Sequence, residues 1–300
     1  MIYTLTLSPA LDYQFICNSI RVGEINKGSN ASYSVGGKGI NVSRFLLNVG
    51  EKSYALGFKG GFAGKIISDF LDDNDIGNGL IQIDGNTRIN VKINGNKETA
   101  FNLDGPFLAK KDVDLLAKKL GKIQEDDILV LSGSVGQLHN DIYKKIIELV
   151  SKNGVKCYLD ASGEALKEGV LSAPYLIKPN ESEFCELIGK KISSLEDFKS
   201  EARKICKDYN IHYVLLSLGK NGALLVTQND SIYQETIKNN ITVRSTVAAG
   251  DTTLGAFIYK KSQDVSDEEA LRYAVAAGCA CVYKGAIPLK EDVDGVLDNI

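Results

Sequence analysis

The chain has 300 residues, of which 44% are hydrophobic and 24% are charged, so it is long enough for one large domain or two smaller ones with a substantial core. Its 35 basic and 38 acidic residues leave a net charge of -3, which gives no electrostatic attraction to nucleic acid or to an anionic membrane. The N-terminus shows no signal sequence and no apolar run approaches the ~20 residues of a membrane span, so we expect a soluble protein of the cytoplasm.

The first part of the chain alternates strand and helix patterns. The β-rich run at 2–7 predicts a strand, and the apolar spacing at 39–49 predicts a helix that Gly50 closes. A second strand is expected at 53–58 and a second helix at 62–73. Such alternation is typical of an α/β fold.

Two polar, β-rich stretches, 13–35 and 87–103, interrupt this alternation. The second contains Asn-Gly-Asn at 94–96, which is a hairpin signal. We predict that the two stretches form a small separate sheet that acts as a lid. The expected domains are a core of residues 1–10, 36–86 and 104–300 and a discontinuous lid of residues 11–35 and 87–103.

After residue 104 the alternation is regular, which predicts a mostly parallel sheet with helices on both faces. A capping box of Ser266 and Glu269 marks the start of the last long helix. Helices are expected at 111–122, 140–152, 163–169, 181–188, 195–208 and 267–284. Strands are expected at 127–133, 156–161, 175–180 and 212–219, and residues 217–226 read as a strand, a Gly-bracketed turn and a strand.

Residues 246–257 (TVAAGDTTLGAF) place Ala249, Gly250 and Asp251 at the start of a helical pattern. The first turn of a helix has unpaired N–H groups, and the helix dipole there favours negative charge. Small residues at this point let a ligand approach the backbone, which predicts an anion site suited to phosphate. An aspartate that only caps the helix is the alternative.

Residues 36–41 (GGKGIN) are rich in glycine and open another helical pattern. Gly37 would let the backbone approach a ligand closely, and Lys38 adds a positive charge. The segment does not match the dinucleotide fingerprint, and residues 60–66 (GGFAGKI) do not match a P-loop. If phosphate binds here, it is therefore held by a structure other than these two motifs. A tight turn from strand to helix explains the glycines at 36–41 equally well.

Asn180 and Glu183 have a spacing that puts both side chains on one side of a helix start. They could hold a hydrated Mg²⁺ through its waters, or form an N-cap with a first-turn acid. The six cysteines contain no C-x-x-C pair and there are only two histidines, so buried free thiols are expected rather than a zinc cluster.

Seven segments, in chain order, together resemble the PfkB carbohydrate kinase family over nearly the whole sequence: TLTLSPALD, GGKGINVSR, TRINVKI, LSGS, KPNESE, SLGKNGALL and STVAAGDTTLGAF. The resemblance implies a ribokinase-like three-layer αβα sandwich with a small β-lid. It also implies ATP-dependent phosphorylation of the 6-hydroxyl of fructose 1-phosphate, with tagatose 6-phosphate and fructose 6-phosphate as alternative substrates, and a homodimer formed through the lid.

By this resemblance, Asp251 is expected to be the catalytic base, with the N–H groups of Ala249 and Gly250 as the anion hole. Asn180 and Glu183 are expected to hold Mg²⁺ through water. The expected contacts of the sugar phosphate are Asp12, Lys27, Gly37, Lys38, Asn41, Arg88 and Ser134. The expected contacts of ATP are Lys178, Asn180, Ser217, Leu218, Gly219, Lys220, Asn221 and Gly222.

One departure from the family pattern is Ala248, which stands where the family has glycine and would be strained by ~1 kcal/mol or more if its φ is positive. A non-catalytic regulator that keeps the fold is therefore an alternative, although Asp251 argues against it. A kinase of an unphosphorylated sugar or nucleoside is disfavoured by Lys38 and Arg88. A dinucleotide oxidoreductase is disfavoured by the missing fingerprint.

Overall fold

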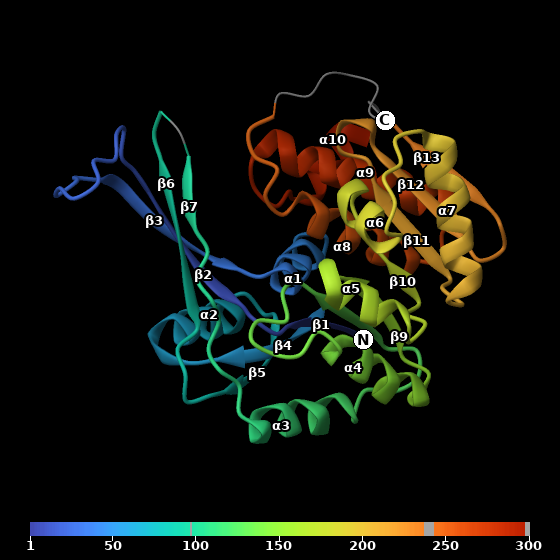
Figure 1. Cartoon of the computed structure of the whole chain (residues 1–300), viewed down its shortest axis with the longest axis horizontal. Coiled ribbons are helices and arrows are strands. Elements are labelled where there is room, and N and C mark those ends of the chain that lie inside the picture. The colour runs from blue at the N-terminus through green and yellow to red at the C-terminus, as the bar shows by residue number, and fades with distance from the viewer. Residues whose placement is uncertain (97, 237–242, 298–300) are drawn as a thin grey trace.

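The computed structural model describes residues 1–96, 98–236 and 243–297, which form two sheets with surrounding helices (Figure 1). The main sheet has nine strands, and the strands from β11 to β5 are parallel while β12 runs antiparallel to both of its neighbours. In their order across the sheet, the strands are β13 (Ile232–Glu235), β12 (Ala223–Thr227), β11 (Tyr213–Ser217), β10 (Leu176–Ile177), β9 (Lys156–Asp160), β8 (Ile128–Ser132), β1 (Ile2–Thr6), β4 (Ser53–Lys59) and β5 (Gly77–Gln82).

Helices cover both faces of this sheet, because alternate residues of its central strands point to opposite sides. On β8, Leu129 and Leu131 belong to one buried cluster and Val130 belongs to another. The first cluster packs under α3 (Lys110–Leu120), α4 (Ile142–Val150), α5 (Gly163–Val170), α6 (Glu181–Leu187) and α7 (Leu195–Asp208). The opposite face carries α1 (Lys38–Asn48), α2 (Gly61–Asp73), α8 (Ala249–Lys261), α9 (Asp267–Lys284) and α10 (Lys290–Leu297).

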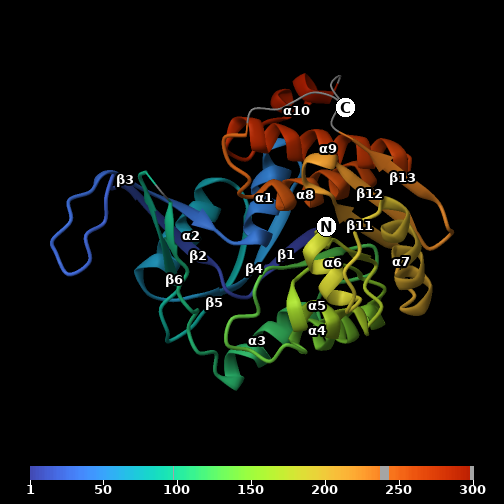
Figure 2. The same ribbon diagram turned by 45° about the horizontal axis from the view of Figure 1, so that its top comes forward.

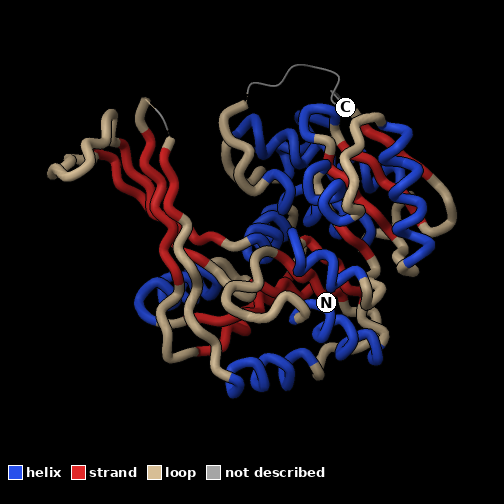
Figure 3. The backbone as a smooth tube through the Cα atoms, in the orientation of Figure 1, coloured by secondary structure: helices blue, strands red, loops and turns tan. Residues whose placement is uncertain are grey.

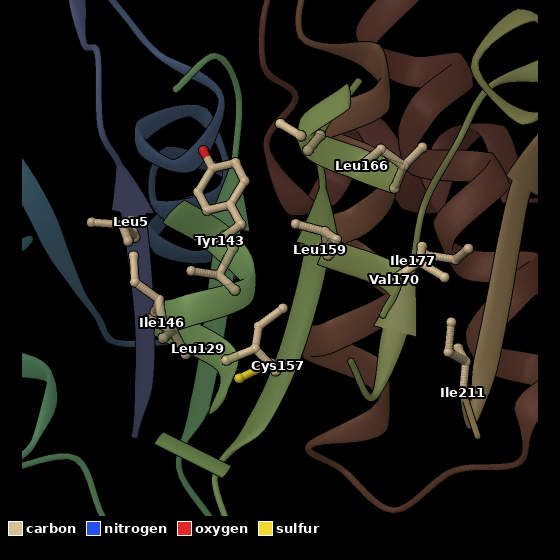
Figure 4. Packing of buried hydrophobic residues seen from close by; sticks show 14 of the residues in the cluster. Leu5, Leu129, Tyr143, Ile146, Cys157, Leu159, Leu166, Val170, Ile177 and Ile211 are labelled. Atoms are coloured by element: carbon tan, nitrogen blue, oxygen red, sulfur yellow. The ribbon is translucent and has the colours of Figure 1, made fainter. Parts of the chain in front are cut away.

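Figure 4 shows how the first cluster interlocks. Tyr143 and Ile146 of α4 pack toward Leu5 and Leu129 on the neighbouring strands. All four side chains are almost completely buried, so this layer is a close-packed core. The core holds the strand ends fixed, and these ends carry the polar residues described below.

The second sheet has four strands in the order β3-β2-β6-β7 and projects from the body of the molecule (Figures 1 and 2). β2 is antiparallel to β3 and parallel to β6, and β6 and β7 form an antiparallel hairpin. The strands are β2 (Ala10–Ile16), β3 (Ser29–Gly36), β6 (Arg88–Asn94) and β7 (Thr99–Phe101). We call this sheet the lid.

The expected α/β order is confirmed, with three elements that the sequence did not reveal: β5, β13 and α10. β5 contains two glycines and an asparagine, which are poor strand formers, and its pairing with β4 holds it in place. The strand expected at 175–180 shrinks to the two residues of β10, because Pro179 has no N–H to donate to a neighbouring strand.

Other expectations are also met. The N–H of Glu269 donates to the hydroxyl of Ser266 at 3.1 Å, which is one half of the expected capping box, while the Glu269 carboxylate accepts from Lys260 at 3.2 Å. All six cysteines are free thiols, and five of them are buried as expected, while Cys185 is only partly buried. Among the described residues, no helix is long and apolar enough to cross a membrane. The smooth trace in Figure 3 shows the helices as an outer layer around the main sheet, with the lid strands standing apart.

Candidate active site

A cleft of about 1310 Å³ lies at the carboxyl ends of the parallel strands. Its floor includes Thr6 at the end of β1, Gly133 after β8, Asp160 at the end of β9 and Ser217 at the end of β11. Ligands of open α/β sheets bind at this edge, because loops and helix N-termini converge there. The N-termini of α1 and α8 both open into the cleft.

Most residues singled out in the sequence line this cleft, although they come from distant segments. They are Gly37, Lys38, Asn41, Arg88, Ser134, Lys178, Asn180, Glu183, Ser217, Gly219, Lys220, Asn221, Gly222, Ala249, Gly250 and Asp251. Three others lie outside its lining: Asp12, Lys27 and Leu218. The cleft therefore gathers the segments whose order carried the family resemblance.

The three outliers have different surroundings. Asp12 lies on the lid, where Asn90 donates to it at 2.8 Å and the Lys92 ammonium is 3.6 Å away. Lys27 is exposed in the loop between β2 and β3. Figure 2 shows this loop at the free end of the lid. The Leu218 side chain is 4% exposed and belongs to the hydrophobic core. Direct roles for these three side chains in binding stay predictions.

Asp251 lies in the first turn of α8 and is only 6% exposed. The amide of Asn41 donates to its Oδ2 at 2.8 Å, which fixes the carboxylate, and Asp251 lines the cleft. Burial, followed by the nearby Asp160 carboxylate, raises the pKa of Asp251 to about 6, while Asn41 and the lysines at 38 and 178 act in the opposite direction. The group can thus exchange a proton near neutral pH.

The backbone at the entry to α8 is left-handed. Ala248 has a φ of 63° and a ψ of 1°. A positive φ strains any residue with a Cβ, so the strain expected at Ala248 is present. The N–H of Ala249 donates weakly to the carbonyl of Thr246 at 3.3 Å. Of the two N–H groups expected to form the anion hole, that of Gly250 is therefore the more available to a ligand.

Gly250 also makes room for a lysine. A Cβ at this position would lie 3.1 Å from the Nζ of Lys178, so any larger residue would push the ammonium away. A positive charge thus lies beside the positive end of the α8 dipole, in a buried setting, and both attract an anion. This arrangement favours a phosphate-sized anion next to Asp251.

Asp160 is the central residue that the sequence reasoning missed. Its carboxylate is 1% exposed and lies 3.0 Å from the Nζ of Lys38 and 3.5 Å from that of Lys178. Burial acts against the charge of Lys38, but the carboxylates of Asp160, Asp251 and Glu183 together outweigh it and raise the pKa of that lysine. The available signal was an acidic residue that ends a buried strand at the carboxyl edge of the sheet.

Gly37 joins the lid strand β3 to α1 with a φ of 130°, which only glycine adopts readily. A Cβ here would lie 2.8 Å from the Cγ2 of Thr6. The tight turn therefore brings the start of α1 onto the end of β1. As a result Lys38 and Asn41 both reach the cleft from one helical turn.

Asn180 and Glu183 form a reciprocal capping box at the start of α6. Each side chain accepts a hydrogen bond from the backbone N–H of the other, both at 2.9 Å. The capping alternative is thus realised, and both side chains still line the cleft. No cluster of three metal-ligating side chains occurs in the described part of the chain. The donors fit a hydrated Mg²⁺ that is shared with ligand phosphates, rather than a cage made by the protein alone.

Part of the cleft lining is apolar, which the sequence analysis did not predict. Val247 precedes α8, while Val275, Cys279 and Val282 come from one side of α9. The turn between β11 and β12 also lines the cleft, with residues 219–222. A cleft with charged and apolar parts suits a nucleotide, whose phosphates and base need these two environments.

Arg88 and Ser134 lie at the side of the cleft near the lid. Arg88 is half-buried, its NH1 donates to the Leu103 carbonyl at 3.2 Å, and burial lowers the pKa of its guanidinium. The Oγ of Ser134 accepts a hydrogen bond from the Gly136 N–H at 3.1 Å. The cleft can thus hold a second anion beside the lid.

Comparisons with known proteins agree with this geometry. A family model described as pfkB family carbohydrate kinase matches residues 8–291. A 1-phosphofructokinase of Bacillus subtilis is 36% identical over 301 residues, covering 100% of this chain and 98% of that protein. A tagatose-6-phosphate kinase of Staphylococcus epidermidis is 33% identical over 285 residues, covering 93% of this chain and 91% of that protein.

The fold has a close counterpart among solved structures. Phosphofructokinase-2 of Escherichia coli in complex with fructose-6-phosphate matches with a TM-score of 0.92 at 28% identity, covering 99% of this chain and 98% of that chain. The ribokinase-like α/β fold expected from the sequence is confirmed.

Proposed function

The chain belongs to the pfkB family of carbohydrate kinases, and from this premise we propose that it transfers the γ-phosphoryl group of ATP to the 6-hydroxyl of fructose 1-phosphate. The products are fructose 1,6-bisphosphate and ADP. The observation that carries the proposal is Asp251, a buried carboxylate with a pKa of about 6 at the mouth of α8, next to the ammonium of Lys178. We further propose that the enzyme acts in the cytoplasm, where ATP is available.

The proposed chemistry starts with a proton transfer. Asp251 takes the proton of the sugar hydroxyl as that oxygen attacks the γ-phosphorus, and Asn41 holds the carboxylate in place during this step. A base with a pKa of about 6 is ionised at neutral pH and still accepts a proton readily.

The negative charge of the transferring group needs stabilisation in the transition state. The N–H of Gly250 and the ammonium of Lys178 lie beside Asp251 and supply it, with Lys38 as a further cation held by Asp160. Mg²⁺, held through water by Asn180 and Glu183, would neutralise part of the charge on the ATP phosphates. The base of ATP fits between the turn at 219–222 and the apolar side of α9.

A phosphorylated sugar is favoured over a neutral one by the charges near the lid. Arg88 lines the cleft, and a neutral sugar brings no anion for its guanidinium to bind. Tagatose 6-phosphate and fructose 6-phosphate carry the same charge and are the alternative substrates. The 36% identity with a 1-phosphofructokinase supports fructose 1-phosphate.

We also propose that the protein is a homodimer joined through the lid. Cross-strand register puts Tyr13, Tyr33, Val91 and Phe101 on one face of this sheet. Three of them are strongly exposed: Tyr13 at 38%, Tyr33 at 59% and Phe101 at 52%. An apolar row across all four strands favours a partner surface of the same kind, which a second copy supplies.

An assay of ADP release tests the proposed activity. Wild-type protein with ATP and Mg²⁺ is offered fructose 1-phosphate, tagatose 6-phosphate, fructose 6-phosphate and fructose in parallel. We expect kcat/KM for fructose 1-phosphate to exceed the others at least tenfold, about 1.4 kcal/mol of transition-state preference. A preference for another sugar phosphate changes the substrate and keeps the mechanism. Binding of ATP without turnover of any sugar contradicts the proposal and favours the regulator.

A further inference from the structure

Ser8 follows β1 and is a polar residue that the activity described above does not use. Its side chain is 6% exposed and lines the cleft. Within residues 1–96, 98–236 and 243–297, its Oγ has no hydrogen-bond partner. Buried hydroxyls almost always have a hydrogen-bond partner, because a hydroxyl without one loses its bond to water on folding and gains none in return. An unpaired hydroxyl in a cleft therefore points to a ligand atom.

The surroundings of Ser8 are built tightly. A Cβ at Gly105 would lie 2.5 Å from the Ser8 Oγ, and one at Gly136 would lie 3.4 Å from the Ser8 Cβ. Two loops therefore pass close to the side chain, and a Cβ in the first of them would displace the Ser8 hydroxyl. One loop precedes α3 and the other follows β8, so Ser8 lies where the chain after β1 meets these two loops.

Arg88 and Ser134 bring further hydrogen-bond donors to the cleft. The Nε of Arg88 is buried and also lacks a partner among the described residues, while its NH1 binds the Leu103 carbonyl, two residues before Gly105. Ser134 accepts from the N–H of Gly136, so its own hydroxyl proton is free to donate into the cleft. Two hydroxyl groups and one guanidinium thus line the same cleft.

We propose that Ser8 is a specificity-determining residue. Its hydroxyl donates a hydrogen bond to the phosphate already carried by the sugar, and Arg88 binds the same phosphate. The inference rests on the proposed function and names a contact that the family resemblance did not supply. A phosphate provides several acceptor oxygens for donors that come from different segments. A neutral sugar hydroxyl carries no negative charge for the guanidinium to bind, so it fits this place less well.

The test compares two alanine variants. Ser8→Ala removes the hydroxyl in question. Ser53→Ala is the matched control, because Ser53 is 7% exposed, its Oγ also lacks a partner among the described residues, and it starts β4 outside the cleft lining. For Ser8→Ala we expect the KM for fructose 1-phosphate to rise about tenfold, with kcat and the KM for ATP unchanged. Ser53→Ala should match the wild type in all three.

A second substrate separates a phosphate contact from a general effect on the cleft. With fructose, which has no phosphate, Ser8→Ala should keep the kcat/KM of the wild type. Equal loss with fructose and fructose 1-phosphate overturns the inference, and so does a KM for fructose 1-phosphate within twofold of the Ser53→Ala value. If the wild type itself does not prefer sugar phosphates to fructose, the proposed function fails as well, and the two failures are therefore distinguishable.

Discussion

Asp251 combines burial with a balance of nearby charges. Asp160 and burial raise its pKa to about 6, while Lys38, Lys178 and the Asn41 amide oppose the rise. The carboxylate must be ionised to accept a proton, so we predict that kcat/KM for the sugar phosphate falls about tenfold per pH unit below pH 6. A pH–rate profile from pH 5 to 9 checks this. A flat profile down to pH 5 contradicts it.

Ala248 carries strain that glycine would relieve. Its φ of 63° costs an alanine about 1–2 kcal/mol, and glycine gives back about 0.4–1 kcal/mol through greater freedom of the unfolded chain. We therefore expect Ala248→Gly to raise the free energy of unfolding by about 0.5–1 kcal/mol in chemical denaturation. Ala173→Gly is the matched control, since Ala173 has a φ of 52° and lies outside the cleft lining. A loss of stability in Ala248→Gly alone contradicts the prediction.

At the scale of the element, the start of α6 serves both the fold and the cleft. Gln can replace Glu in a capping box, because its side-chain oxygen still accepts from the N-cap N–H. Glu183→Gln should therefore keep the melting temperature within about 2 °C but raise the Mg²⁺ concentration needed for half-maximal rate several-fold. Asn180→Ala, which removes the cap, should lower stability by about 1 kcal/mol. An unchanged Mg²⁺ requirement in Glu183→Gln would show that Glu183 only caps the helix.

Elements with local signals were predictable, and elements that depend on neighbours were not. The capping pattern at Ser266 marks the start of α9, and the Asn-Gly-Asn at 94–96 marks the β6–β7 hairpin. The sequence of β5 has low strand propensity, and the strand forms because it pairs with β4. Strand propensity is weak compared with the pairing and burial that tertiary structure supplies.

The same distinction applies to the cleft. Asp251 and Gly37 were identified because each lies in a short motif with its own physical reason. Asp160 was missed, because its role depends on Lys38 and Lys178, which are brought to it by other strands and helices. The apolar residues of α9, such as Val275, look like ordinary core residues in the sequence.

At the scale of the whole molecule, the lid has a large surface that its own chain leaves uncovered. Tyr33 is 59% exposed and lies opposite Tyr13 in the apolar row. We expect Tyr33→Asp to give a monomer in sedimentation velocity, because a charge in such a row is costly to bury between two copies. Phe62→Asp, at an exposed aromatic position on α2, is the control and should keep the wild-type mass. A dimer that survives Tyr33→Asp contradicts the lid interface.

The central claim is that Asp251 is a catalytic base maintained at a cost to stability. Its folded pKa of about 6 lies above the ordinary value of 3.8, so burying the ionised form costs stability above pH 6, and this cost disappears as the pH falls toward 4. Asp251→Asn keeps the shape and removes the charge. The variant should therefore be more stable than the wild type at pH 8, by roughly 1–3 kcal/mol, and gain little at pH 4.

The most direct measurement is the kcat of Asp251→Asn with saturating ATP, Mg²⁺ and fructose 1-phosphate, on protein whose melting at pH 8 shows that it is folded. A positioned general base contributes about 10²–10⁴-fold, and we predict a loss of that size. A folded variant that keeps its kcat within tenfold of the wild type contradicts the assignment of Asp251 as the base.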